Sequence, residues 1–194
     1  AIPEHCFGCY KILIPLANVL ELFKLALVFH TLNLPKDNTR KCIVEVRPDV
    51  MKNYKGLIYC NGFEEGKMIL EEVRAIVKEK ISNQIEVSLK KGCSEFALAY
   101  PGYGQFDDLG RSKMGYKEEW RCHEEHTDRY LTRHIFATSI SSYNHKGFTL
   151  QDILIMKNWL SYAATNRDLT YKSICGSVKI CNRFKRPDVQ APRL

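Results

Sequence analysis

The cysteines are the residues whose type and spacing could do chemistry. The chain has eight of them in 194 residues, and Cys6 and Cys9 form a Cys-x-x-Cys pair near its start. Thiolates bind Zn²⁺ or iron–sulfur clusters far better than they bind Mg²⁺ or Ca²⁺, and thiols at this spacing also carry out redox chemistry. The alternative is that the cysteines fill the core, because free cysteine is among the most buried residue types.

The elements that must position these thiols follow from the hydrophobic periodicity. Strands are expected over 9–14, 42–47, 56–60 and 85–90, and helices over 16–29 and 64–81. This order predicts an α+β protein with a ferredoxin-like split βαββαβ unit. Its antiparallel sheet has the order 4-1-3-2, and its helices lie on one face. The apolar run 15–34 approaches membrane-spanning length, but Glu21, Lys24 and His30 interrupt it, so a buried helix and no membrane contact are expected.

Strand alternation predicts which side chains the helices cover. The covered face is expected to hold Val44, Val46, Ile85, Val87 and Leu89. The open face is expected to hold Lys11, Glu45, Arg47, Glu86, Ser88 and Lys90.

Combined with this topology, the cysteine positions predict a site at one edge of the sheet. Cys9 starts the first strand, Cys42 starts the second, Cys60 ends the third and Cys93 follows the fourth. Because the first two strands run opposite to the last two, these positions meet at one edge. The predicted site, for zinc or an iron–sulfur cluster or for thiol chemistry, consists of Cys6, Cys9, Cys42, Cys60 and Cys93, with His5 as a possible nitrogen ligand.

The pleat of the strands argues against all of these thiols pointing to one spot. In the alternation of strand faces, Cys42 and Cys93 fall on the same face as core residues, whereas Cys9 falls on the same face as Lys11. Redox chemistry by Cys6 and Cys9 therefore remains open beside metal binding. The thioredoxin arrangement, in which such a motif opens a helix after a strand, is absent.

A second, weaker cluster consists of Cys122, His123 and His126, in a helix expected over about 117–134. The two histidines are one turn apart, so both could face one metal ion. Their spacing differs from the His-Glu-x-x-His of metalloproteases, and a solvated charged helix is the alternative.

The segment 53–60, Asn-Tyr-Lys-Gly-Leu-Ile-Tyr-Cys, resembles the central motif of RNA-recognition-motif domains, which share the predicted fold. That family stacks bases on aromatic side chains of the central strands. Matched on Gly56, this sequence places Lys55 and Leu57 at the stacking positions. The resemblance therefore implies a single-strand binding face without its usual rings.

Three regions are expected along the chain: the βαββαβ core over 1–93, a loop and two helices packed on the core over 94–171, and a basic tail over 172–194. The net charge is +7, and the tail has six basic residues and one acidic residue, so it carries about +5 of that charge. The tail is thus the expected contact surface for nucleic acid. A protein partner or a second copy of the chain is the other possible partner.

No export signal is visible, so a cytoplasmic location is expected. The sequence contains no Walker loop, no nucleophile elbow and no dinucleotide fingerprint, and it does not decide whether the protein is an enzyme. The leading hypothesis is a protein with a cysteine-lined site. The alternative is a non-catalytic binding or structural module that uses the open sheet face and the tail.

Overall fold

The computed structural model describes residues 1–47, 52–134, 148–176, 178 and 180. The sheet region consists of β1 (Cys9–Leu16), α1 (Val19–Thr31), β2 (Arg40–Val44), β3 (Tyr54–Asn61), α2 (Phe63–Lys80) and β4 (Ser88–Lys91). The later helices are α3 (Ser94–Ala99), α4 (Arg121–His134), α5 (Leu150–Thr165) and α6 (Lys172–Cys175). Short 3₁₀ helices are η1 (Glu4–Gly8), η2 (Pro101–Gly104), η3 (Glu118–Trp120) and η4 (Leu169–Tyr171).

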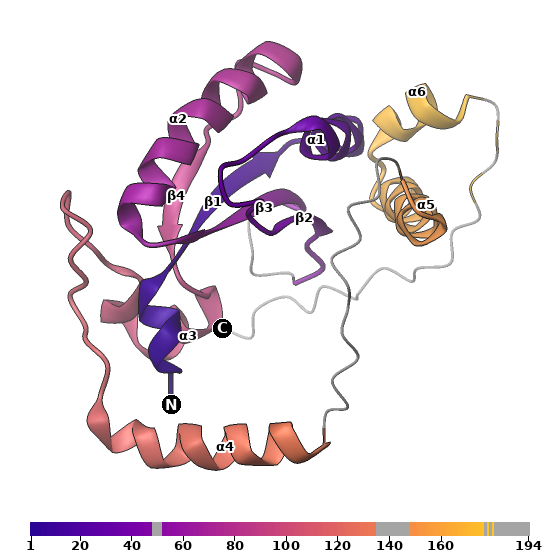
Figure 1. Cartoon of the computed structure of the whole chain (residues 1–194). Helices are drawn as coiled ribbons and strands as arrows, with labels where there is room; N and C mark the ends of the chain where they lie inside the picture. Colours follow the sequence, from indigo (N-terminus) through magenta and orange to yellow (C-terminus); the bar gives the residue numbers. More distant parts are fainter. Residues whose placement is uncertain (48–51, 135–147, 177, 179, 181–194) are drawn as a thin grey trace, which may run out of the picture.

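The four strands form one antiparallel sheet in the order β2-β3-β1-β4 (Figure 1). This confirms the α+β class and the predicted strand order, read from the opposite edge. The bounds of all four strands differ from the prediction. β1 and β3 are each longer than predicted, β2 begins at Arg40 and ends at Val44, and β4 begins only at Ser88. The segment expected as a loop after Cys93 contains α3 and η2.

Local sequence signals explain where the helices begin. The Asn18 side chain caps α1 by accepting a hydrogen bond from Glu21 N at 2.9 Å. Glu64 and Glu65 occupy the first turn of α2, where the helix dipole favours acidic side chains. α5 begins with a capping box of Thr149 and Asp152.

α1 and α2 cover the same face of the sheet. The strand residues that they contact lie on one face, as the pairing of the strands shows. A Cβ at Gly56 of β3 would lie 2.2 Å from Leu25 Cδ2, so α1 rests directly on the backbone of β3. At Gly66 of α2 a Cβ would lie 2.7 Å from Leu89 of β4. Between them, Ile12 of β1 pairs with both Ile58 and Leu89. The core therefore lies between this face and the helices.

The side chains expected on the open face are exposed at Arg47, Glu86 and Ser88, but Lys11 and the two positions of the resembling motif, Lys55 and Leu57, are buried. Lys11, Lys55 and Leu57 have only 8%, 9% and 7% of their surface accessible. Two further predictions, at Glu45 and Val46, are wrong: Glu45 is 6% exposed and Val46 is 63% exposed. The reason is that β2 ends at Val44, so the alternation of strand faces no longer applies to the residues that follow.

Two packing units lie beyond the sheet. α5 packs on α1 through an edge-to-face contact of Phe23 and Trp159, with ring centroids 5.7 Å apart. At the other end, the N-terminal segment joins the region after β4 in a second small core of Ile2, Tyr103 and Trp120. No helix among the described residues has the length and apolar character needed to cross a membrane.

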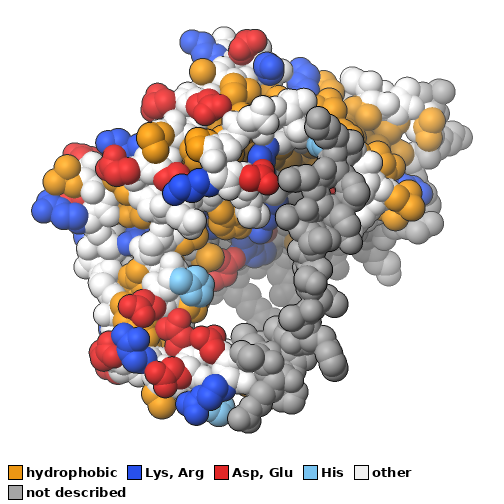
Figure 2. All heavy atoms as spheres, in the orientation of Figure 1, with side chains coloured by type: hydrophobic (Ala, Val, Ile, Leu, Met, Phe, Trp, Pro, Cys, Tyr) orange, Lys and Arg blue, Asp and Glu red, His pale blue; other side chains and the backbone are white. Residues whose placement is uncertain are grey.

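Most charged side chains of α4 up to residue 130 lie in solvent. Of its residues 121–130, all are exposed except Glu124, which is partly buried. Acidic and basic side chains gather over this part of the molecule, at the bottom of the view (Figure 2).

Candidate functional site

Three of the predicted cysteines lie together where β1 begins and β4 ends. Cys6 lies in η1, Cys9 begins β1, and Cys93 follows β4. Gly92 N donates a hydrogen bond to Cys9 O at 2.9 Å, and this bond holds the turn before α3 against the start of β1. Residues more than 80 positions apart in the sequence are thereby joined.

Tyr103 lies among these three cysteines. It is fully buried, and its hydroxyl donates to Cys6 O at 3.0 Å. Its ring lies against Gly92, where a Cβ would be 2.0 Å from Tyr103 Oη and where φ is +56°. Only glycine satisfies both the backbone angle and the close approach.

The electrostatics of this cluster favour the protonated form of Cys6 and Cys9. Burial raises the pKa of Cys6, and the neighbouring thiols of Cys93 and Cys9 and the Glu124 carboxylate raise it further. Burial likewise raises the pKa of Cys9, with a further contribution from Cys93. These contributions place the sulfur atoms of Cys9 and Cys93 within electrostatic reach of Cys6, and that of Cys93 within electrostatic reach of Cys9. Near neutral pH Cys6 and Cys9 are therefore thiols, which need a base to become nucleophilic.

A base lies beside one of them. His5 Nε2 is 3.5 Å from Cys6 Sγ; the His5 side chain is exposed and Cys6 is partly buried. Glu124 of α4 holds η1, the helix that contains His5 and Cys6. Its carboxylate accepts a hydrogen bond from Glu4 N at 3.1 Å and another from Tyr116 Oη at 3.0 Å. Sequence reasoning assigned no role to Glu124, because its partner Glu4 lies 120 positions away along the chain.

Cys42 and Cys60 lie apart from this cluster. Cys42 pairs with Gly56, well along β3 from its end, because β2 starts earlier than predicted. Cys60 pairs with Tyr10, and Cys9 pairs with Asn61, so the thiols of Cys60 and Cys9 point to opposite faces of the sheet. Burial raises the pKa of Cys42 to about 12 and that of Cys60 to about 11. These two thiols are part of the helix-covered core.

Neither predicted cluster has the geometry of a preformed metal centre. Within residues 1–47, 52–134 and the described part after 148, no group of three or more His, Cys, Asp or Glu residues is placed to bind a metal ion. The weaker candidates Cys122, His123 and His126 are exposed along α4.

A buried lysine lies close to the thiol cluster and was missed by sequence reasoning. Lys91 is 2% exposed, and its ammonium lies 5.8 Å from the ring centroids of both Phe7 and Tyr10. Burial lowers its pKa. The predicted strand ended at residue 90, so no sequence signal placed Lys91 opposite Tyr10, where the register puts it.

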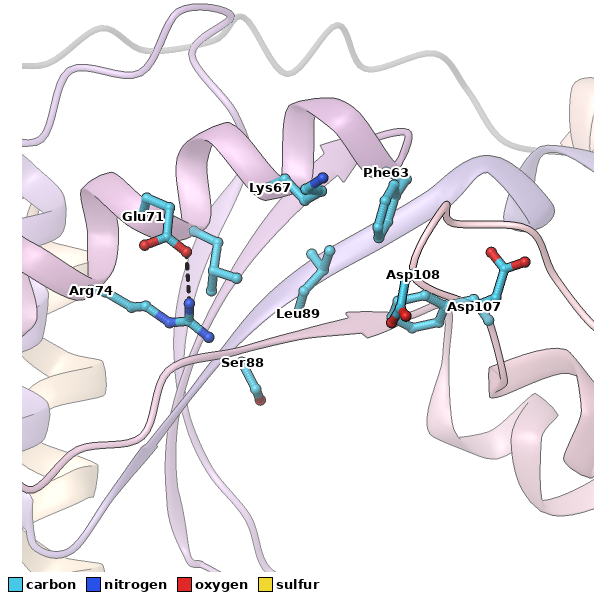
Figure 3. Close-up of a pocket in the computed structure, with 10 residues that line it drawn as sticks. Phe63, Lys67, Glu71, Arg74, Ser88, Leu89, Asp107 and Asp108 are labelled. Atoms are coloured by element: carbon cyan, nitrogen blue, oxygen red, sulfur yellow. Dashed lines mark hydrogen bonds and ion pairs between the residues drawn. The ribbon is translucent and has the colours of Figure 1, made fainter.

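A groove of about 470 Å³ lies between α2, β4 and the segment 106–108 (Figure 3). It is lined by Phe63, Lys67, Leu70, Glu71, Arg74, Ser88, Leu89, Phe106, Asp107 and Asp108. Its floor is apolar, and five of its ten lining residues are charged.

Comparison with known proteins adds no assignment: no protein family, no curated protein and no solved structure matches this chain.

Proposed function

We propose that Cys6, Cys9 and Cys93 form a thiol–disulfide site that exchanges electrons with a disulfide substrate. The observation that supports this most directly is the gathering of three free thiols from distant segments around the Tyr103 hydroxyl, where Cys93 and Cys9 raise the pKa of Cys6 and Cys93 raises the pKa of Cys9. Two neighbouring thiolates repel each other. Joining their sulfur atoms as a disulfide removes this repulsion.

In this proposal Cys6 is the attacking thiol, because it is the member of the cluster with a base beside it. The imidazole of His5 takes the proton from Cys6 Sγ, and the thiolate attacks the substrate disulfide. One substrate thiol leaves with a proton and a mixed disulfide forms. Cys9 or Cys93 then attacks the Cys6 sulfur and releases the second substrate thiol. The protein is oxidised by two electrons and the substrate is reduced by two.

The test is to incubate the reduced protein with oxidised glutathione and to map the disulfides by mass spectrometry. We expect a disulfide between Cys6 and either Cys9 or Cys93. Cys6→Ser should abolish the reaction, whereas Cys9→Ser or Cys93→Ser should trap the mixed disulfide at Cys6 if the replaced residue is the resolving one. Cys122→Ser is the matched control, because Cys122 is an exposed thiol on α4 outside the cluster.

The reaction should be slow near neutral pH and should accelerate as the pH rises toward the raised pKa of Cys6. Equal labelling of all exposed cysteines, with no preferred disulfide, would refute the proposal. Retention of stoichiometric zinc or iron by protein purified under reducing, anaerobic conditions would replace it with the metal-binding alternative at the same cysteines.

We further propose that the sheet with α1 and α2 belongs to the ferredoxin-like class, on the basis of its strand order and its one helix-covered face. A reversible dithiol suits a reducing compartment, which supports a cytoplasmic location.

The nucleic-acid alternative is less well supported, because Lys55 and Leu57, in the segment that resembles the RNA-recognition motif, are buried. Nucleic-acid binding through the basic tail depends on the sequence beyond Cys181, which lies outside the described residues. If the tail binds nucleic acid, retention of the protein on single-stranded nucleic acid should fall steeply with salt.

A further inference from the structure

Two lysines face each other beside the thiol cluster, on the face of the sheet opposite α1 and α2. Cys9 and Lys11 are two positions apart in β1, so their side chains point to the same face. Lys11 pairs with Lys90 of β4 in the strand register, and Lys90 Nζ donates a hydrogen bond to Ser94 Oγ at 2.8 Å. Because Ser94 directly follows Cys93, the two lysines lie next to two of the three clustered thiols.

The pairing of Lys11 with Lys90 is electrostatically unfavourable. Side chains of like charge directly opposite each other on neighbouring strands destabilise a sheet. Lys11 is only 8% exposed, and in the part of the chain that the structure describes its ammonium has neither a hydrogen bond nor an ion pair. A buried charge without a partner is costly. An anion bound by both ammonium groups would remove both costs.

The carboxylates near these lysines are paired with other cations. Glu45 pairs with Arg47 at 2.7 Å and with Lys55 at 3.4 Å. Glu95 lies within electrostatic reach of Lys11, but its carboxylate pairs with Arg47 at 2.8 Å. Arg47 and Lys55 therefore balance these two carboxylates, and the charges of the two facing lysines remain.

The charge around the thiols differs between the members of the cluster. Burial raises the pKa of Cys9 and Cys93 adds to this effect, whereas the charge of Lys11 lowers the same pKa. The Glu124 carboxylate lies instead within electrostatic reach of Cys6. The surroundings are therefore more positive beside Cys9 and more negative beside Cys6. A substrate whose disulfide meets Cys6 is best placed with a negative group toward Lys11.

We propose that Lys11 and Lys90 bind a carboxylate of a small disulfide substrate, so that the thiol site acts on acidic disulfides. This assignment rests on the proposed thiol–disulfide function and gives its substrate class. The anion is a carboxylate, because thiol compounds derived from cysteine carry this group a few bonds from the sulfur. Two ammonium groups hold it by charge-assisted hydrogen bonds and thereby position the disulfide for attack by Cys6.

The test compares three small symmetrical disulfides that differ in charge: dithiodipropionate is anionic, hydroxyethyl disulfide is neutral and cystamine is cationic. Each is mixed with the reduced full chain, and the loss of the free Cys6 thiol is timed by alkylation and mass spectrometry. Lys11→Met and Lys90→Met keep an unbranched side chain but remove its charge. We expect each variant to lower the rate with the anionic disulfide, relative to the neutral one, about fivefold. The relative rate with the cationic disulfide should rise.

The use of rate ratios removes two other effects. Differences in the intrinsic reactivity of the disulfides cancel, because the same three compounds meet every protein. A change in the Cys9 thiol caused by the loss of Lys11 affects all three compounds alike. Lys78→Met, in the exposed last turn of α2, is the matched control and should leave the ratios unchanged. Added salt should reduce the wild-type preference toward that of the variants, because it screens the charges.

Unchanged ratios in both lysine variants, or a wild-type ratio that does not respond to salt, would overturn the carboxylate site. The proposed function is tested separately by hydroxyethyl disulfide, which carries no charge. Its reaction at Cys6 supports the thiol–disulfide function whatever the lysine variants show. If none of the three compounds oxidises Cys6, both proposals are wrong.

Discussion

Glu45 illustrates how a residue just past a strand end is held in place by its partners. It is 6% exposed, and Arg47 donates to its two carboxylate oxygens at 2.8 and 2.7 Å. Lys55 lies 3.4 Å from the same carboxylate, and the hydroxyl of Tyr162 donates to Glu45 O at 3.0 Å. Glu45 thus connects β2, β3 and α5.

We predict that Glu45→Gln lowers the free energy of unfolding at pH 7 by about 1–3 kcal/mol, because it removes a charge-assisted hydrogen bond and leaves Lys55 without its carboxylate. The hydrogen bonds from Arg47 hold the pKa of Glu45 at about 2, below its usual 4.5. The contribution is therefore present above pH 4.5 and is lost as the pH falls toward 2. Urea unfolding at pH 7 and pH 3 checks this.

The exposed Glu86 provides the control for this prediction. Glu86→Gln should change the free energy of unfolding by less than about 0.5 kcal/mol at either pH. If both variants behaved alike at pH 7, the ion pairs of Glu45 would contribute nothing measurable to stability.

At the scale of the elements, the junction of β4 with α3 depends on one glycine. Gly92 combines a φ of +56° with a position where a Cβ would lie 2.0 Å from Tyr103 Oη. The same residue gives the bond to Cys9 O that closes the thiol cluster. A side chain at residue 92 must displace either the strand end or the ring of Tyr103.

We predict that Gly92→Ala lowers the free energy of unfolding by about 1–3 kcal/mol, since both the backbone angle and the contact with Tyr103 become unfavourable. It should also separate Cys93 from Cys9 and so reduce disulfide formation with oxidised glutathione. Gly115→Ala is the control, because nothing lies within 4 Å of a Cβ there. Equal stability and equal disulfide yield in the two variants would contradict the prediction.

At the scale of the whole molecule, distant segments are joined at both ends of the sheet. At one end, the Asp168 carboxylate accepts a hydrogen bond from Val19 N at 2.7 Å, so the chain after α5 helps to cap α1. At the other end, Ile2 is fully buried in the second small core with Tyr103 and Trp120. The N-terminal residues thereby fix the region that precedes α4.

We predict that Ile2→Asp lowers the free energy of unfolding by about 2–4 kcal/mol, because it buries a carboxylate with no partner in an apolar cluster. The loss should be local, so proteolysis between α3 and α4 should accelerate before the sheet unfolds. Limited proteolysis followed by mass spectrometry would locate the first cuts. Leu27→Asp on the exposed side of α1 is the control, and it should leave the cutting pattern unchanged.

The sequence alone determined the order of the elements and the order of the strands, because hydrophobic periodicity and the handedness of βαβ connections act locally. It also placed Cys6, Cys9 and Cys93 at one sheet edge. It could not determine how far each strand extends. The early start of β2 moved Cys42 away from that edge, and its end at Val44 reversed the exposure of Glu45 and Val46.

Only the tertiary structure decided which side chains meet. His5 is next to Cys6 in the sequence, but their approach depends on η1, which Glu124 fixes from α4. Lys91 is buried against Phe7 and Tyr10 because β4 extends one residue beyond the predicted strand. Such contacts join residues about 80 to 120 positions apart, and their free energies depend on packing and desolvation, which periodicity along a chain does not encode.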